Sequence, residues 1–193
     1  MIRKLVVSGM LAVLTSASFA QDVPARTVFT NVHIFDGVNE KRIENANVLV
    51  EGKLIAAVST DQINADGATV IDGGGRTLMP GLSDTHTHIA FGSLSQAQFL
   101  VGLEGYNYIH STKDAEAMLM RGFTSIRDMG GNTFGLKKAI DEGIVAGPRI
   151  YPAGGAISQT AGHGDFRFPN QKNPSFGGAH AAPYQQGHGF LVD

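Results

Sequence analysis

The stretch Leu78-Met-Pro-Gly-Leu-Ser-Asp-Thr-His-Thr-His-Ile89 carries two histidines, separated by one residue, at the end of a short apolar run. Successive side chains of a strand point to opposite faces, so His86 and His88 are expected on one face, within reach of one ion. Neutral imidazole suits Zn²⁺ and its neighbours among the divalent metals. Such an ion would lower the pKa of a bound water toward ~7 and make it a nucleophile. The stretch therefore predicts a strand that ends in part of a hydrolytic metal site.

Two features beside the pair support this interpretation. Asp84 lies two residues before His86, so we expect its carboxylate on the same face, as a further ligand or as a second-shell group that orients one. The dipeptide Pro80-Gly81 favours a turn directly before the strand. Two histidines at this spacing also arise by chance or at a polar strand end, and the residues alone leave that alternative open.

Residues before the pair alternate between apolar and polar in the manner of strands. Strands are expected at residues 28–35, 46–50 and 54–58, and Glu51-Gly52-Lys53 is expected to join the last two as a hairpin. These strands predict a small β-sandwich over residues 21–80. His33 lies within the first strand and is interpreted as a structural or surface histidine.

Beyond the pair, strands alternate with helices. Residues 95–120 lack proline and have apolar positions at helical spacing; Gly105 and the cap signal Ser111-Thr-Lys-Asp114 predict two helical pieces. A strand at 123–127, a helix at 133–142 and a strand at 149–153 are expected to follow. This order is typical of a parallel sheet with helical crossovers.

Several segments together resemble one family. Residues 78–89 resemble the first barrel strand of the amidohydrolase superfamily, while Arg121-Gly-Phe-Thr-Ser-Ile-Arg-Asp128 and Gly147-Pro-Arg-Ile-Tyr151 resemble its second and third strands. Ser158-Gln-Thr-Ala-Gly-His-Gly-Asp165 is similar to a loop of the branch that contains Xaa-Pro and Xaa-Arg dipeptidases and imidazolonepropionases. The resemblance runs from about Thr27 to the last residue. It implies an α/β fold in which the β-sandwich is followed, over residues 81–193, by the first three βα units of an incomplete (β/α)₈ TIM-type barrel.

The resemblance also implies a reaction. Members of this family hydrolyse a carbon–nitrogen bond of an amide, a cyclic amide or a dipeptide, commonly with two Zn²⁺ ions, of which His86 and His88 would hold one. The family's remaining ligands and its proton-transferring aspartate would lie beyond Asp193, so no catalytic residue is expected within this chain. We therefore expect an N-terminal fragment that is inactive alone. The alternative is a non-catalytic exported module that pairs through an exposed sheet edge as a homo-oligomer.

Other polar residues are candidates for the same rim, because barrel active sites lie at the C-terminal ends of the strands. Asp128 closes the second strand; it could act chemically, cap the next helix or pair with Arg127 or Arg121. His163 lies between glycines in its loop, and the resemblance implies that it contacts substrate; the alternative is an ordinary loop residue.

The last part of the chain holds three more residues of interest. His180 and His188 lie in a tail rich in glycine, alanine, proline and glutamine, where no chemistry is expected of them. Tyr184 could contact substrate in a complete enzyme.

The first 20 residues are typical of a signal peptide. Arg3 and Lys4 precede an apolar stretch, and Ser18-Phe-Ala20 is a small-x-small cleavage site. The apolar stretch is too short for a stable membrane span. We therefore expect export to the periplasm or the medium, with no membrane attachment after cleavage.

The composition of the chain excludes several classes of protein. The apolar fraction of 42% and the charged fraction of 17% indicate a globular chain, and there is no cysteine to form a disulfide. Removal of Arg3 and Lys4 would change the formal charge from −2 to −4, with mixed charges throughout. Neither the net charge nor its mixed distribution favours a nucleic-acid partner. The resemblance to the amidohydrolases implies a small-molecule amide or dipeptide as the substrate.

Overall fold

The computed structural model describes residues 24–155, 157–159, 161–165, 167, 170, 172 and 191–192. The chain divides between Met79 and Pro80 into two compact units, each of which is described by itself. The predicted signal peptide, residues 1–20, lies outside the described residues. Among the helices that are described, none has the length and apolar character needed to cross a membrane.

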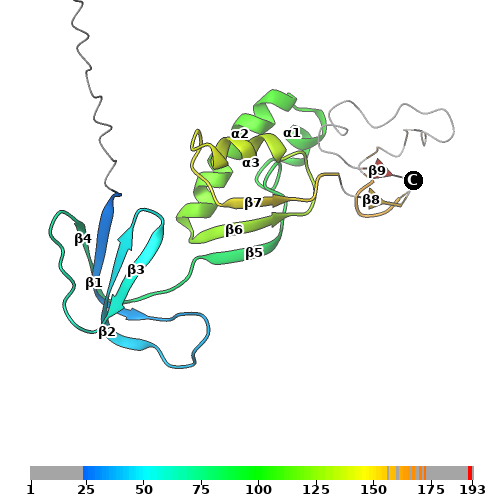
Figure 1. The fold of residues 1–193 in the computed structure, drawn as a ribbon. Coiled ribbons are helices and arrows are strands. Elements are labelled where there is room, and N and C mark those ends of the chain that lie inside the picture. Colours follow the sequence, from blue (N-terminus) through cyan, green and yellow to red (C-terminus); the bar gives the residue numbers. More distant parts are fainter. Residues whose placement is uncertain are drawn as a thin grey trace, which may run out of the picture. The chain divides into compact units, whose positions relative to one another are not determined.

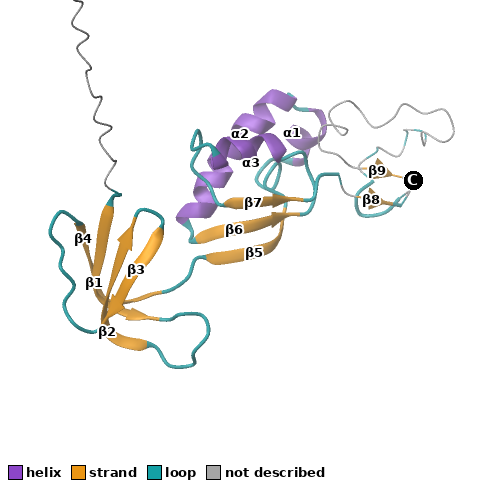
Figure 2. Cartoon of the chain, viewed as in Figure 1, coloured by secondary structure: helices purple, strands orange, loops and turns teal. Residues whose placement is uncertain are grey.

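The first unit is a four-stranded sheet (Figures 1 and 2). Its strand order is β3-β2-β1-β4, with β1–β2 and β2–β3 antiparallel and β1–β4 parallel. Gly52 takes a positive φ of 59° in the β2–β3 hairpin, as expected for a tight turn. The strands are β1 (Arg26–Ile34), β2 (Ile43–Glu51), β3 (Leu54–Ser59) and β4 (Thr69–Leu78).

The side chains of this sheet divide into a buried and an exposed group. Val32, Ile34 and Val48 belong to its buried cluster, whereas Leu54 and Ile55 are 74% and 70% exposed. The predicted β-sandwich is not confirmed, because residues 24–79 form a single sheet and its second layer is not among the described residues. Alternation of apolar side chains indicates which residues share a face, but it does not identify the element that covers that face.

The second unit contains a three-stranded parallel sheet of order β5-β6-β7. A helix follows each of the first two strands, and Figure 1 shows α2 and α3 on the same side of this sheet. The mixed α/β fold expected from the sequence is therefore present. The elements are β5 (Leu82–Thr87), α1 (Gln96–Val101), α2 (Glu104–Met120), β6 (Phe123–Asp128), α3 (Phe134–Asp141), β7 (Arg149–Pro152), β8 (Ile157–Ser158) and β9 (Leu191–Val192).

The core of this unit lies between the sheet and its helices. Ile126 and Ile150, each 1% exposed, contact Ala115 of α2, Leu136 of α3 and Ile89 at the end of β5. Burial of such side chains contributes roughly 1.5–3 kcal/mol each. This packing holds the C-terminal ends of β5 and β6 side by side.

The helical boundary differs from the prediction. The two helices α1 and α2 are separated by Gly102 and Leu103. Helix α1 begins after Ser95, which forms a capping box with Gln98. The predicted cap signal at residues 111–114 lies inside α2. Ser111 there donates its hydroxyl to the carbonyl of Tyr108 at 2.7 Å, an arrangement that lets serine remain within a helix.

Candidate functional site

The end of β5 contains an irregularity that determines where its side chains point. In the parallel pairing with β6, Asp84 lies opposite Ile126 and Thr87 lies opposite Asp128. Three steps along β5 thus correspond to two along β6, which places one extra residue in β5. Such bulges reorient side chains and recur beside active sites.

The structure brings the two predicted histidine ligands together. The ring centroids of His86 and His88 lie 5.3 Å apart, with their planes at 80°. His86 is exposed and His88 is half-buried. Two imidazoles in this arrangement are close enough to bind a single ion after small rotations about their side-chain bonds.

His88 is held by contacts on two sides. Its Nδ1 lies 3.4 Å from the carbonyl oxygen of Gly130, and its ring stacks on Phe91 at 5.1 Å between centroids. Phe91 in turn contacts the ring of Phe99 at 4.4 Å. Because a carbonyl only accepts, the Gly130 contact assigns the proton to Nδ1 and leaves the lone pair on Nε2. This is the usual arrangement of a histidine that ligates a metal.

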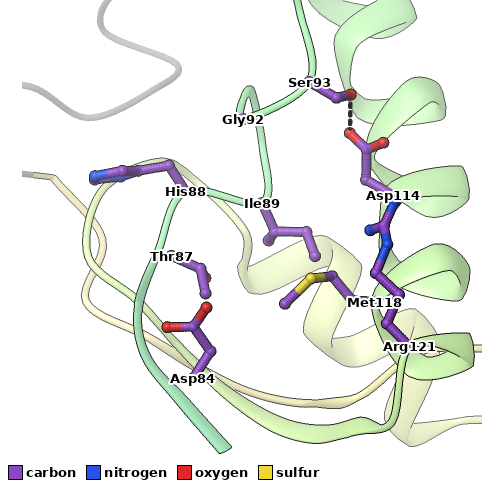
Figure 3. A pocket seen from close by; sticks show the side chains of 9 residues that line it. All are labelled: Asp84, Thr87, His88, Ile89, Gly92, Ser93, Asp114, Met118 and Arg121. Atoms are coloured by element: carbon purple, nitrogen blue, oxygen red, sulfur yellow. Dashed lines mark hydrogen bonds between the residues drawn. The ribbon is translucent and has the colours of Figure 1, made fainter.

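Asp84 contacts the main chain of His86, and its role as a further ligand or as a group that orients one stays a prediction. Its Oδ1 accepts a hydrogen bond from the backbone N–H of His86 at 3.0 Å. In Figure 3 its carboxylate lies beside Thr87, whereas the ring of His88 points away from both. The extra residue between Asp84 and Thr87 shifts the alternation of the strand and explains the difference. The hydrogen bond between Asp84 and His86 thus fixes the main chain of His86.

Asp128 is completely buried at the end of β6. Its Oδ2 accepts a hydrogen bond from the hydroxyl of Thr133 at 2.6 Å, and its Oδ1 accepts none from the described residues. Burial raises the pKa of Asp128, while the hydrogen bond from the Thr133 hydroxyl and the charge that His88 carries when protonated act in the opposite direction. Of the alternatives open from the sequence, the ion pair with Arg127 is not formed, because that guanidinium donates to the carbonyl of Thr85 at 2.8 Å.

His163 lies apart from these groups as far as the described contacts show. Its side chain is exposed, and no contact joins it to either histidine of the pair within the described ranges. Its loop is closed by Asp165, which accepts from the Ala161 amide at 2.8 Å and pairs with Arg167. The Arg167 guanidinium holds the pKa of Asp165 well below its usual range. The assignment of His163 to substrate binding stays a prediction, and His180, Tyr184 and His188 lie outside the described residues.

A cavity of about 290 Å³ opens between the end of β5 and α2 (Figure 3). Its wall combines apolar with charged groups, and the Ser93 hydroxyl within it donates to Asp114 at 2.5 Å. His110, one helical turn before Asp114, lies 3.4 Å from the same carboxylate. The lining residues are Asp84, Thr87, His88, Ile89, Gly92, Ser93, Asp114, Met118 and Arg121.

His88 is one of the lining residues, and in Figure 3 its ring points away from Ser93 and Asp114. Ser93 and His110 are not among the residues predicted from the sequence. The spacing of His110 and Asp114, four residues apart on a helix, was the available signal.

The histidine pair provides two nitrogen ligands for a metal. No group of three or more metal-binding side chains occurs among the residues that the structure describes. The free Nε2 of His88 and the adjacent His86 ring fit the first part of a zinc site, which commonly takes three or four protein ligands.

Comparison with known proteins decides the family. The model of the amidohydrolase family matches residues 77–181, which is more than half of the chain. This chain belongs to the amidohydrolase family. Its members are generally metal-dependent, which agrees with a histidine pair at the end of a parallel strand.

Individual amidohydrolases match shorter or longer parts of the chain. Ochratoxinase of Aspergillus niger is 38% identical over 91 residues, covering 46% of this chain and 19% of the relative. Imidazolonepropionase of Anaeromyxobacter sp. (strain K) is 38% identical over 72 residues, covering 35% of this chain and 17% of the relative.

A prolidase crystallised with N-methylphosphonate-L-proline has 32% identity and a TM-score of 0.72, and the match covers 87% of this chain and 40% of the prolidase. The chain thus spans less than half the length of each of these proteins.

Proposed function

We propose that this amidohydrolase chain contributes to a metal-dependent site that hydrolyses a carbon–nitrogen bond. The observation that carries the proposal is the pair of adjacent imidazoles at the end of β5, with Nε2 of His88 left for an ion by the Gly130 carbonyl. A bound zinc ion would supply a water of lowered pKa, ~7, as the nucleophile. The metal is proposed as Zn²⁺, with two ions in a complete site.

The residues of this chain would prepare the site in distinct ways. His86 and His88 would ligate the ion, and the contact between Nδ1 of His88 and Gly130 would fix its tautomer. Phe91 would keep water from one face of the His88 ring. Asp84 would hold the main chain of His86 at the bulge.

The parallel sheet is proposed as the beginning of a (β/α)₈ barrel. Its three strands run in chain order, and both connections that follow them are helical. The likeness to the prolidase structure, at a TM-score of 0.72, supports this interpretation. In such a barrel the histidine pair and Asp128 would lie on the catalytic rim formed by the C-terminal ends of the strands.

The proposed substrate class is a small amide, cyclic amide or dipeptide, in line with the names of the prolidase and imidazolonepropionase relatives. Residues 1–20 support export to the periplasm or the medium. Inactivity of the 193-residue chain alone is part of this proposal, and a dipeptidase assay with zinc present tests it.

Zinc binding by the purified chain tests the proposal. We expect one zinc site by competition with a chromophoric chelator, and more than about 100-fold weaker binding for His86→Asn and His88→Asn, since even outer-shell changes cost 10–100-fold. His33→Asn is the matched control, because His33 pairs with Glu44 in the first unit. Equal affinity in all three variants would reject the histidine pair as the site.

An exported module without hydrolase activity is the second candidate. The observation that favours it is that β5 and β7 each pair with one neighbour in the described sheet, so both edges are open. This function predicts a defined homo-oligomer by light scattering, a cooperative thermal transition and no zinc binding. A monomer that binds zinc would exclude it.

A further inference from the structure

Asp128 is a buried carboxyl group for which the proposed ligand set has no use. It is 0% exposed, and Oδ1 receives no hydrogen bond from the described residues. Burial of a carboxyl group with an unsatisfied oxygen costs free energy, so its presence calls for an explanation. Its surroundings provide one.

The turn that follows Asp128, residues 129–132, is attached to the ends of both neighbouring strands. The backbone N–H of Met129 donates to the carbonyl of Thr87 at 2.9 Å. The N–H of Gly131 donates to the carbonyl of Gly154 at 3.1 Å. The turn therefore has a defined position relative to the end of β5, where the histidine pair begins.

The side chains at the two ends of this turn are bonded to each other. Thr133 is the residue before α3 and makes no capping hydrogen bond to that helix. Its hydroxyl donates instead to Asp128 across the turn, at 2.6 Å. Serine and threonine at this position usually cap the helix with their side chains. The Thr133 hydroxyl closes the turn instead, and α3 begins without a side-chain cap.

Gly130 lies within the closed turn, and its carbonyl is the group that contacts Nδ1 of His88 at 3.4 Å. The backbone amides of Gly130 and Ile89 also face the Asp128 carboxyl group and lower its pKa, against the effect of burial. Asp128 thus contacts the residue after His88 and the residue that orients the His88 ring.

We propose that Asp128 is a positioning residue for the histidine pair. Together with Thr133 it closes the turn at residues 129–132, which holds the Gly130 carbonyl against Nδ1 of His88 and keeps Nε2 available to an ion. The role in metal binding rests on the proposed function. The tautomer of His88, in contrast, is a property of the metal-free chain.

The tautomer provides a readout that a merely structural role would not change. Long-range ¹H–¹⁵N spectra of the metal-free 193-residue chain, at a pH where imidazoles are neutral, distinguish Nδ1–H from Nε2–H rings. We expect His88 to be mainly Nδ1–H, and to shift toward Nε2–H in Asp128→Asn and in Thr133→Val. Asp141→Asn is the matched control, because that exposed carboxylate pairs with Lys137 on α3.

Zinc affinity gives the second readout. Both variants are expected to bind zinc 10–100-fold more weakly than the unmodified chain, and Asp141→Asn to bind it equally. A tautomer shift in a chain that binds no zinc would reject the proposed function and leave the positioning role standing. Zinc binding with an unchanged His88 tautomer in the variants would reject the positioning role alone.

Two further results would also overturn the inference. The first is a His88 ring that is mainly Nε2–H in the unmodified chain. The second is an unmodified chain without a dispersed spectrum, since the inference requires these residues to form the turn themselves. If Asp128→Asn does not fold, Thr133→Val decides, because it removes one hydroxyl and retains the carboxylate.

Discussion

Replacement of Gly131 by alanine should destabilise the second unit, because its backbone conformation and its surroundings both exclude a side chain. Gly131 has a φ of 126°, in a region that residues with a Cβ rarely adopt. An added Cβ would lie 3.0 Å from Cβ of Ala90 and 3.5 Å from Cε1 of Phe91. The strained backbone costs about 1–3 kcal/mol. The crowding adds about 1 kcal/mol, the lower end of the cost of overpacking, so we expect a loss of about 2–4 kcal/mol in the free energy of unfolding.

Urea unfolding followed by tyrosine fluorescence measures this loss. The chain has no tryptophan, and its four tyrosines all lie after residue 79, so the signal reports only the second unit. With a urea dependence of about 1.5 kcal/mol per molar, the midpoint should fall by about 1.3–2.7 M.

Gly135→Ala is the matched control. Gly135 lies in α3, and a Cβ added there would meet no atom within 4 Å. Because alanine favours a helix over glycine, this variant should be neutral or more stable by up to about 1 kcal/mol. A Gly131→Ala variant that unfolds within about 0.5 kcal/mol of the unmodified chain would refute the described turn.

Three other outcomes are expected. Ile126→Ala should lower the free energy of unfolding by about 2–5 kcal/mol in the same assay, because this core side chain is 1% exposed. Ile109→Ala, at a position that is 72% exposed, should change the free energy of unfolding little. Equal effects of the two substitutions would contradict the packing. Burial raises the pKa of Asp128, so the folded state retains this proton to a higher pH than the unfolded chain does. The unmodified chain should therefore lose stability relative to Asp128→Asn as pH rises from 3.8 through the raised pKa. A stability difference that is constant with pH would contradict this cause. Zinc at about 100 times its dissociation constant should stabilise the second unit by about 2.7 kcal/mol, and removal by a chelator should reverse the gain; no shift of the transition would count against the metal site.

Much of the local structure follows from the sequence. Strands β1 to β3, the hairpin at Gly52 and the order of β6, α3 and β7 agree with predictions from periodicity and turn residues. The proximity of His86 and His88 follows from their spacing in a strand, because side chains two residues apart share a face. These features depend on residues that are close together in the chain.

Other features depend on contacts between distant segments, and the sequence alone did not reveal them. The extra residue in β5 reflects its register against β6, and the Asp84 carboxylate lies beside Thr87 while the His88 ring points elsewhere. The predicted sandwich is not confirmed by the single four-stranded sheet of the described residues, because alternation does not show what covers an apolar face.

The contacts that prepare the site are of the same kind. The Gly130 carbonyl that orients His88 lies 42 residues further along the chain. The sequence places Asp128 at a strand end. Its burial and its hydrogen bond with Thr133 depend on the packing of the neighbouring strands and cannot be predicted from the sequence. The sequence by itself therefore determined which candidate ligands are present and on which strand they lie. Only the tertiary structure decided how they are oriented, because ring and carboxylate orientation depends on backbone groups supplied by neighbouring strands.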